Sequence, residues 1–576
     1  MTAPEQEPRA DHRGILEGDD RVRHVSLQGD DASVDVAPSA LRRWGWGMAT
    51  LALLFVTPYV VPGLSRFAPW RPGDGYIPFW NIVGRELMGQ GKQQEAARAE
   101  VARLEELARQ ALDNAEPAAS EDEPAGRNHA ALPTGSVPGD QSVPKVYPAY
   151  AVPAADAVEV AVGIENVAQL DHYYERLTLT ELGLPGAITR ASQWGDSVLG
   201  GDGLTSAIRR RLQHRFGDAG HGFHSLGRYN LSYVHQGVRY GDRGGWRTCE
   251  IIFKCEPDGR YGYAGVTSRS SGGGTSRWRT AAKGIGSSVS RFEFWYAKDP
   301  EGGRFQVKVD GEVERVIDTR ADAPADAITS FWVPDGEHSF EVRAIGGGVA
   351  RGYGVVLERD NPGIVWDELA LIGSFTQRLD YQDPEHLAWQ VDHRGVDMLV
   401  FMFGGNDVQR ETMDLVHTMQ PYEDEYARVL RKFKAGRPSA SCLVMSLMDH
   451  GERAGQFGVQ SRRIVPKLVL SQQKVALAEG CAFFNTFQAM GGKDSIARWY
   501  NARPQLAGAD FSHPTIAGQE LIATLLYRAL MQGYAGFRKD HEGKPLPEVG
   551  PGPVRDDIVK LESKKPSKTD ADAGAK

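Results

Sequence analysis

Three short runs of continuous apolar sequence, at residues 398–403, 441–446 and 481–485, constrain the fold of this chain more than any other feature. Stretches with helical apolar spacing separate them. Strands that are apolar at every position are buried on both faces, as in a parallel sheet covered by helices on both sides. The pattern therefore predicts an α/β fold, and we expect the strand predicted at 188–194 to join the same sheet.

A different pattern fills the middle of the chain. Between about residues 233 and 357, short runs such as 291–296 and 304–309 alternate apolar and polar residues, and turn signals separate them. Such period-two patterning predicts an all-β sandwich or jelly roll. Because strand–helix alternation resumes afterwards, we predict an α/β domain at 158–535 that is interrupted by a β module at 230–355.

The N-terminal part contains a candidate membrane anchor. Residues 44–64 are almost uncharged and strongly apolar, and their length matches the hydrocarbon core of a bilayer. Arg42 and Arg43 precede this segment, which favours a cytoplasmic N-terminus and an external main domain. Residues 1–43 are polar, and we expect them to be disordered. A buried hydrophobic helix is the alternative for 44–64, since two prolines shorten its apolar run.

The remaining segments are expected to be linkers and tails. Residues 65–157 combine a helical stretch at 82–112 with a Pro- and Ala-rich spacer, so they predict a stalk, a short coiled coil or a solvated amphipathic helix followed by a flexible linker. Residues 536–576 are charged and are predicted to be a disordered tail. The formal net charge of −9, with scattered basic residues, gives no reason to expect nucleic-acid binding.

The chain has four cysteines, Cys249, Cys255, Cys442 and Cys481. An even number permits disulfides in an exported protein without requiring them. Cys442 and Cys481 each open a predicted strand, so they lie side by side if those strands are neighbours. We expect free buried thiols, and no spacing of Cys and His suggests a metal site.

Two motifs more than three hundred residues apart carry the chemistry. Ser197, in Gly-Asp-Ser, directly follows the strand at 188–194, and Asp510 precedes His513 by three residues. A serine hydroxyl needs a neighbouring base to act as a nucleophile, and the base needs a group that orients it. Ser197, His513 and Asp510 supply these three roles for acyl transfer through a serine ester. A similar motif at 383–386 is rejected because no apolar strand precedes it.

Acyl transfer also requires donors for the oxyanion of the tetrahedral intermediate. The candidates are the backbone N–H of Ser197, the backbone N–H of Gly373 and the side-chain amide of Asn406. Ser197 and the turn at 404–407 both follow predicted strands, and ligands bind beyond the carboxyl ends of strands in open α/β sheets. A simple turn without function is the alternative for Asn406.

In this order, the four blocks around Ser197, Gly373, Asn406 and His513 resemble the SGNH (GDSL-type) hydrolase family over residues 158–535. The resemblance implies a flavodoxin-like three-layer α/β/α fold and hydrolysis or transfer of ester-linked acyl groups, with no metal and no cofactor. Ile372 departs from the family, in which asparagine often precedes the glycine. A β module between the first two blocks further resembles the branch of peptidoglycan O-acetyl esterases and O-acetyltransferases, whose module looks carbohydrate-binding.

From these features we predict a serine esterase that removes acetyl or other small acyl groups from a cell-envelope glycan. We expect it in the cytoplasmic (inner) membrane as a single-pass protein, with the catalytic domain on the periplasmic or extracytoplasmic side. An O-acetyltransferase that uses the same acyl-serine, with an envelope partner that supplies acyl groups, remains open. So does a glycan-binding protein without catalysis.

Overall fold

The computed structural model describes residues 57, 99, 102–110, 144–410, 413–454 and 458–562. The segments 1–43 and 44–64, predicted to be a disordered tail and a membrane anchor, lie outside these residues except for Thr57. Within the described ranges, no helix is both long and apolar enough to cross a bilayer.

A six-stranded sheet forms the centre of the domain, in the order β1-β19-β16-β15-β2-β14. Neighbours from β19 to β14 are parallel, and β1 runs antiparallel to β19 at the edge. The strands are β1 (Ile164–Glu165), β2 (Ile188–Gly195), β14 (Gly363–Ala370), β15 (Met398–Met402), β16 (Ser441–Met445) and β19 (Ala482–Phe484). The predicted α/β fold is therefore confirmed.

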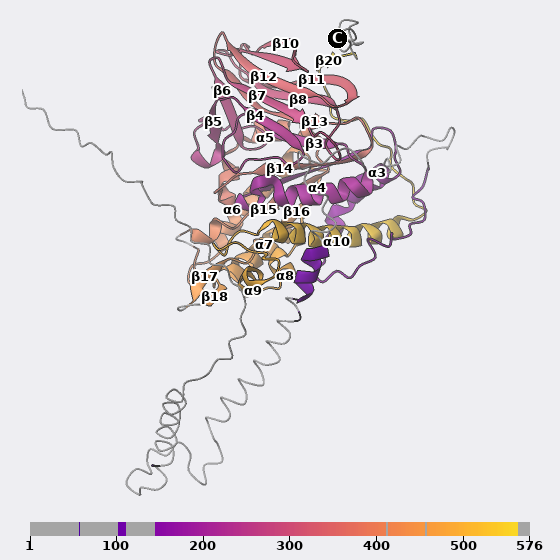
Figure 1. Cartoon of the computed structure of the whole chain (residues 1–576), viewed down its shortest axis with the longest axis vertical. Coiled ribbons are helices and arrows are strands. Elements are labelled where there is room, and N and C mark those ends of the chain that lie inside the picture. Colours follow the sequence, from indigo (N-terminus) through magenta and orange to yellow (C-terminus); the bar gives the residue numbers. More distant parts are fainter. Residues whose placement is uncertain are drawn as a thin grey trace, which may run out of the picture. The chain divides into compact units, whose positions relative to one another are not determined.

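Helices cover both faces of this sheet (Figure 1). Side chains of β15 alternate between two hydrophobic cores: Met398 and Val400 face one core, and Leu399 and Phe401 face the other. The first core contains residues of α3 (Asp171–Glu181), α4 (Gly203–Phe216) and α10 (Ile516–His541). The second contains residues of α5 (Pro384–Arg394), α6 (Gln420–Gly436) and α7 (Val465–Ala478).

The segment between β2 and β14, which are neighbours in the central sheet, supplies every strand of two further sheets except β20. One has the order β10-β9-β12-β7-β4, and the other has β20-β11-β8-β13-β6-β5 with β3 paired to β13. Their strands are β3 (Gly220–Ser225), β4 (Val238–Asp242), β5 (Arg247–Glu250), β6 (Val266–Ser270), β7 (Thr275–Thr280), β8 (Val289–Lys298), β9 (Arg304–Val309), β10 (Glu312–Asp318), β11 (Ala325–Gly336), β12 (Ser339–Gly346), β13 (Ala350–Glu358) and β20 (Asp557–Lys560).

These two sheets pack face to face and onto the α/β layers. Along β8, Phe292 and Phe294 point into an aromatic core shared with the five-stranded sheet. Trp295 points the opposite way, into the core that contains Trp194 of β2. Because β3 already pairs with β13, the β region extends over Gly220–Glu358 and exceeds the predicted bounds of 230–355 at both ends.

A buried ionic cluster joins the β region to the central sheet. Glu358 of β13 accepts hydrogen bonds from Arg190 of β2 (3.0 and 2.8 Å) and from Arg394 of α5 (2.6 Å), and it also pairs with Arg291 of β8. Arg394 further donates to both carboxylate oxygens of Asp367 on β14, at 2.8 Å each. Each of these five side chains is at most 7 % exposed, so the charges are compensated by protein partners rather than by water, and Glu293, which pairs with Arg291, adds a further negative charge.

The prediction of a disordered tail at 536–576 is wrong for residues 536–562. Helix α10 continues to His541, and β20 adds to the edge of the β region by pairing in parallel with β11. Arg555 Nε also donates to Glu293 Oε1 at 2.6 Å. Apolar side chains that extend α10, and the ion pair between Arg555 of the tail and Glu293 of β8, account for this order. Neither was visible in the charged composition of the tail.

The predicted linker 65–157 ends earlier in the structure than its predicted boundary. Tyr147 is buried, and its N–H donates to the Lys544 carbonyl oxygen at 2.9 Å, so the domain begins before the predicted residue 158. Residues 102–110 are helical, as the pattern over 82–112 predicts. Leu104 and Ala108 are buried in the core with α10, which excludes the fully solvated helix for this part.

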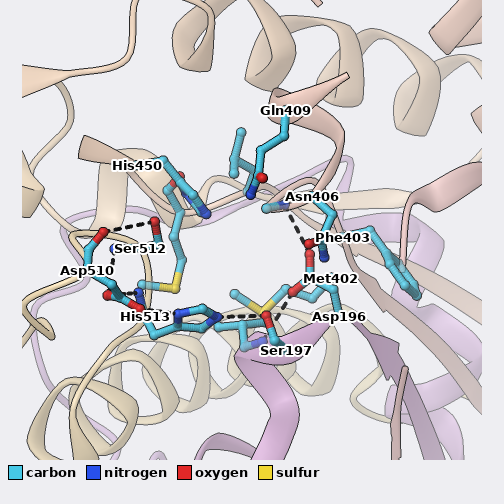
Figure 2. Close-up of a pocket in the computed structure, with 14 residues that line it drawn as sticks. Asp196, Ser197, Met402, Phe403, Asn406, Gln409, His450, Asp510, Ser512 and His513 are labelled. Atoms are coloured by element: carbon cyan, nitrogen blue, oxygen red, sulfur yellow. Dashed lines mark hydrogen bonds and ion pairs between the residues drawn. The ribbon is translucent and has the colours of Figure 1, made fainter. Parts of the chain in front are cut away.

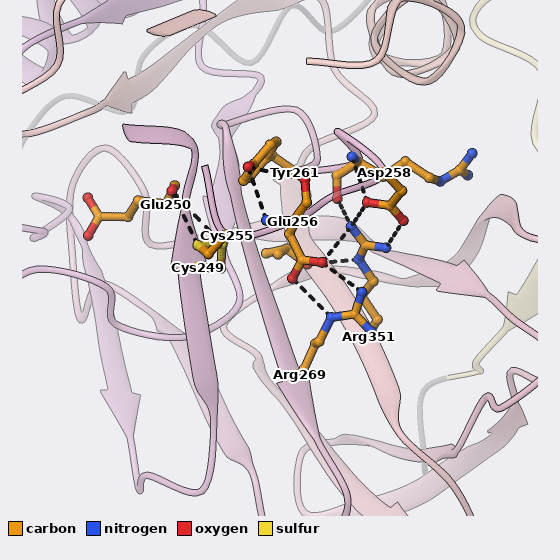
Figure 3. Close-up of a disulfide and its surroundings, with 10 residues drawn as sticks. Cys249, Glu250, Cys255, Glu256, Asp258, Tyr261, Arg269 and Arg351 are labelled. Atoms are coloured by element: carbon orange, nitrogen blue, oxygen red, sulfur yellow. Dashed lines mark hydrogen bonds and ion pairs between the residues drawn. A yellow bond between two sulfur atoms is a disulfide. The ribbon is translucent and has the colours of Figure 1, made fainter. Parts of the chain in front are cut away.

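Both cysteine pairs form disulfides, so the expectation of free thiols is wrong. The disulfide between Cys442 and Cys481 joins β16 to the start of β19. The two strands are parallel neighbours in the sheet, which is the condition under which these cysteines were expected to lie side by side. Cys249 and Cys255 close a short loop after β5. Beside that loop, Glu256 receives two hydrogen bonds from Arg269, at 2.9 and 2.7 Å (Figure 3).

Replacing Glu358 by Gln tests the ionic cluster. The Glu358→Gln variant keeps the shape of the side chain but removes the negative charge that three buried arginines share. Removing one partner from such a buried cluster lowers the free energy of unfolding by about 3–5 kcal/mol. We expect its urea midpoint to fall by the corresponding amount. The matched control is Asp318→Asn, in an exposed pair with Arg320, which is expected to keep the wild-type midpoint. Equal midpoints for both variants would show that the cluster does not stabilise the fold.

Candidate active site

Ser197 lies at a sharp turn at the carboxyl end of β2. Gly195 ends the strand, Asp196 caps the following short helix through a bond from the Val198 N–H (3.1 Å), and Ser197 begins that helix. A Cβ at Gly195 would lie 2.8 Å from the Met402 carbonyl oxygen of the neighbouring strand. Only glycine therefore lets the turn sit this close to β15.

The turn after β15 is tied to the serine turn. The Gly405 N–H donates to Asp196 Oδ2 at 3.0 Å, and Gly404 takes a left-handed backbone conformation (φ 127°). Asn406 follows, and its side-chain amide donates to the Ser374 carbonyl oxygen at 3.1 Å. The buried Asp196 carboxylate thus positions both loops through backbone amides.

The histidine lies on a loop that leads into α10. Thr515 caps the helix with its hydroxyl, and the Gly508 N–H donates to the His513 carbonyl oxygen at 2.8 Å. Phe511 adopts a left-handed conformation (φ 55°), and its carbonyl oxygen accepts from the Gly451 N–H at 2.7 Å. These bonds hold the loop rigidly against the chain segment that follows β16.

Ser197, His513 and Asp510 form one chain of hydrogen bonds (Figure 2). Ser197 Oγ lies 2.7 Å from His513 Nε2, and His513 Nδ1 lies 2.6 Å from Asp510 Oδ2. The other oxygen of Asp510 accepts from the backbone N–H groups of Ser512 and His513, at 3.1 Å each. Although partial burial raises the pKa of Asp510, these hydrogen bonds outweigh it, and the pKa lies below its usual value. Asp510 is therefore ionised at neutral pH, which suits a group that orients an imidazole.

A small cavity of about 110 Å³ opens at this chain of hydrogen bonds. Ser197, Asn406 and His513 line it, and its apolar wall is formed by Val198, Met402, Phe403, Leu447 and Met448. A water molecule takes up about 30 Å³ in the liquid, so the cavity holds a group of only a few heavy atoms.

The three predicted oxyanion donors are not equally placed. Ser197 and Asn406 line the cavity, whereas Gly373 is absent from its lining, is exposed and has a left-handed conformation (φ 80°). Gly373 lies in the turn after β14, one residue before the Ser374 carbonyl that the Asn406 amide contacts. This turn packs on the serine turn, because Gly200 leaves space for Ile372.

Three residues that the motifs did not predict as site residues also line the cavity: His450, Gln409 and Ser512. His450 follows β16 by five residues, so its position at the carboxyl edge of a predicted parallel strand was the signal that could have found it. The rejected motif at 383–386 has a structural role: Asp383 caps α5, and buried His386 pairs with Asp326 at 2.8 Å. Within the described residues, no group of three or more His, Cys, Asp or Glu side chains is arranged to hold a metal ion.

Asp196 gives the site a testable pH dependence. Burial raises its pKa to about 6, above the roughly 3.9 of an unfolded aspartate. The folded state therefore binds the proton of Asp196 more tightly than the unfolded state does. The stability that this proton contributes is present below pH 4 and is lost as the pH rises through 6. Relative to wild type, we expect the non-ionising Asp196→Asn variant to gain about 2 kcal/mol in free energy of unfolding between pH 4 and pH 7.

Urea titrations at several pH values measure this difference. Asp322→Asn, at an exposed position of the β region, is the control and should run parallel to wild type. Parallel curves for Asp196→Asn as well would contradict the raised pKa.

Comparisons with known proteins agree with this geometry. The GDSL-like lipase/acylhydrolase family matches residues 331–521. No curated protein matches the chain in sequence. A solved peptidoglycan O-acetylesterase has a similar fold, with a TM-score of 0.53, 18% identity, and coverage of 63% of this chain and 96% of that one.

Two further structures match with lower TM-scores, which do not establish a common fold over their length. A salicylyl-acyltransferase from a tetracycline biosynthetic pathway has a TM-score of 0.23, 14% identity and coverage of 53% of this chain and 95% of that one. A family two carbohydrate esterase from Clostridium thermocellum, solved with cellohexaose, has a TM-score of 0.22, 11% identity and coverage of 52% and 100%. By its family match, the chain carries a GDSL-like (SGNH-type) acylhydrolase domain, an ester hydrolase that resembles the peptidoglycan O-acetylesterase in fold.

Proposed function

We propose that the protein is a serine esterase that removes acetyl or another small acyl group from a cell-envelope polysaccharide such as peptidoglycan. The observation that carries the proposal is the hydrogen-bonded chain from Ser197 through His513 to Asp510, which opens on a cavity of about 110 Å³.

In the first half-reaction, Ser197 Oγ attacks the ester carbonyl carbon while His513 Nε2 takes the hydroxyl proton. Asp510 holds the tautomer with the proton on Nδ1 and stabilises the imidazolium. The Ser197 N–H, the Asn406 amide and the Gly373 N–H are the proposed donors to the oxyanion. Collapse breaks the bond to the sugar oxygen, which receives the proton from His513 and leaves as a hydroxyl.

In the second half-reaction, water replaces the sugar. His513 Nε2 takes a proton from the water as it attacks the acyl-serine, and the proton then passes to Ser197 Oγ as the free acid leaves. His513 and Asp510 are about half exposed, so water can reach the acyl-serine. This exposure supports hydrolysis, although it does not exclude another hydroxyl as the acceptor.

Two observations support a polymeric glycan as the substrate. The solved protein of similar fold is named a peptidoglycan O-acetylesterase. The first loop of the β region also contacts the short helix that begins at Ser197, since the Ser232 carbonyl oxygen accepts from the Gly201 N–H at 2.8 Å. Its Tyr229 donates to the Ala370 carbonyl oxygen at the end of β14, at 2.6 Å. The β region therefore lies next to the reactive serine, where a carbohydrate-binding module would hold a chain.

Replacing the serine tests the proposal. We expect Ser197→Ala to lower turnover of an aryl acetate, and release of acetate from O-acetylated peptidoglycan, by at least about a thousandfold, since no nucleophile remains. Ser271→Ala, at an exposed position of the β region, is the matched control and should keep both activities. Retained turnover in Ser197→Ala would contradict the assigned nucleophile.

The same assay separates the alternatives. An O-acetyltransferase would move the acetyl group to an added glycan acceptor, in concert with an envelope partner that supplies acyl groups, whereas an esterase releases free acetate. A glycan-binding protein without catalysis would neither turn over ester nor react with a fluorophosphonate probe.

We further propose that residues 44–64 anchor the protein in the cytoplasmic membrane, with the catalytic domain on the extracytoplasmic side. The apolar run and the arginines before it support the anchor, and two disulfides support an oxidising compartment. The full chain is then expected in the membrane fraction after a carbonate wash, and a variant without residues 1–64 is expected in the soluble fraction. Equal partitioning of the two would contradict the anchor.

A further inference from the structure

His450 is a cavity residue to which the mechanism above assigns no role. It lies on the segment between β16 and the strand β17 (Gly451–Ala454), is 8 % exposed and lines the cavity together with Ser197 and His513. In the view of Figure 2, His450 and Gln409 lie across the cavity from Ser197 and His513. An imidazole held here faces whatever the serine attacks.

The hydrogen-bond partner of His450 determines what its ring presents to the cavity. Nδ1 lies 3.1 Å from the Met448 carbonyl oxygen, which can only accept, so Nδ1 carries the proton. Burial, with smaller effects from His513 and Arg462, lowers the pKa of His450 to about 4 against the opposing effects of the Met448 bond and of Asp510. The ring is therefore neutral at pH 7, and Nε2 has a free lone pair that can only accept.

The neighbouring backbone leaves room for this nitrogen. A Cβ at Gly405 would lie 3.0 Å from His450 Nε2 and 3.1 Å from Asp196 Oδ2, so a side chain there would press on both. Glycine at 405 thus lets the imidazole approach the loop that carries Asn406. Within the described part of the chain, no donor hydrogen-bonds to His450 Nε2.

We propose that His450 is a substrate-positioning residue, whose Nε2 accepts a hydrogen bond from an O–H or N–H group of the sugar that carries the ester. This inference rests on the proposed glycan esterase function and identifies a residue that determines its substrate specificity. The wall combines five apolar side chains with polar groups, among which the Asn406 amide is a donor and the Asp196 and Asp510 carboxylates already accept backbone N–H groups. Beside the Gln409 amide, His450 Nε2 therefore offers an open acceptor that a sugar ester can use and a simple ester cannot.

Two substitutions separate the acceptor from the packing of the ring. His450→Asn keeps a side-chain N–H near the Nδ1 position and loses the acceptor at Nε2, whereas His450→Gln brings a carbonyl oxygen back towards that position. We compare kcat/KM for O-acetylated peptidoglycan with kcat/KM for an aryl acetate, which has no donor hydrogen. One hydrogen bond corresponds to about a tenfold change, so we expect the ratio of the two constants to fall about tenfold in His450→Asn and to recover in His450→Gln.

His541→Asn is the matched control, because His541 Nδ1 makes the same kind of bond, to the Phe537 carbonyl oxygen at 2.9 Å, at the far end of α10. It should leave the ratio at the wild-type value. Equal losses on both esters in His450→Asn, or a ratio that His450→Gln does not restore, would overturn the inference while the esterase function stands. A wild-type enzyme that turns over the aryl acetate through Ser197 but releases no acetate from peptidoglycan would overturn both.

Discussion

The arrangement of the β region against the central sheet depends on the buried carboxylate of Glu358. It lies at the end of β13 and neutralises arginines from the central sheet, from α5 and from β8. Asp367 of β14 extends the cluster by binding Arg394 and by accepting from the Phe223 N–H of β3 at 2.8 Å. Leaving a buried charge without its partner is strongly destabilising, so this cluster favours the docking of the β region in which every partner is present.

That docking bears directly on the reactive serine. Strand β2 carries Arg190 near its start and ends at Gly195, so the strand that the cluster holds is the strand that presents Ser197. The loop through Tyr229 and Ser232 then contacts the last residue of β14 and the turn after β2. The β region is thereby held against the turn that follows Ser197, and none of its described residues lines the cavity or belongs to the hydrogen-bonded chain of the serine.

Much of the fold followed from local pattern. The apolar runs at 398–403 and 441–446 are β15 and β16, because a strand buried on both faces favours apolar residues at successive positions. The disulfides and β20 did not follow. Pairing of Cys442 with Cys481 depends on which strands are neighbours, and β20 is held by β11, more than two hundred residues away in the sequence.

The sequence by itself determined the chemistry that is available: a serine after a strand, a histidine three residues after an aspartate, and an asparagine in a glycine-rich turn. Their types and positions relative to strands are local properties. Only the tertiary structure decided which groups share the cavity, because the spatial order of strands brings the ends of β2, β15 and β16 together. The same strand order brings His450 and Gln409 into the cavity lining. Gly373 lies outside this lining, in the turn next to Asn406.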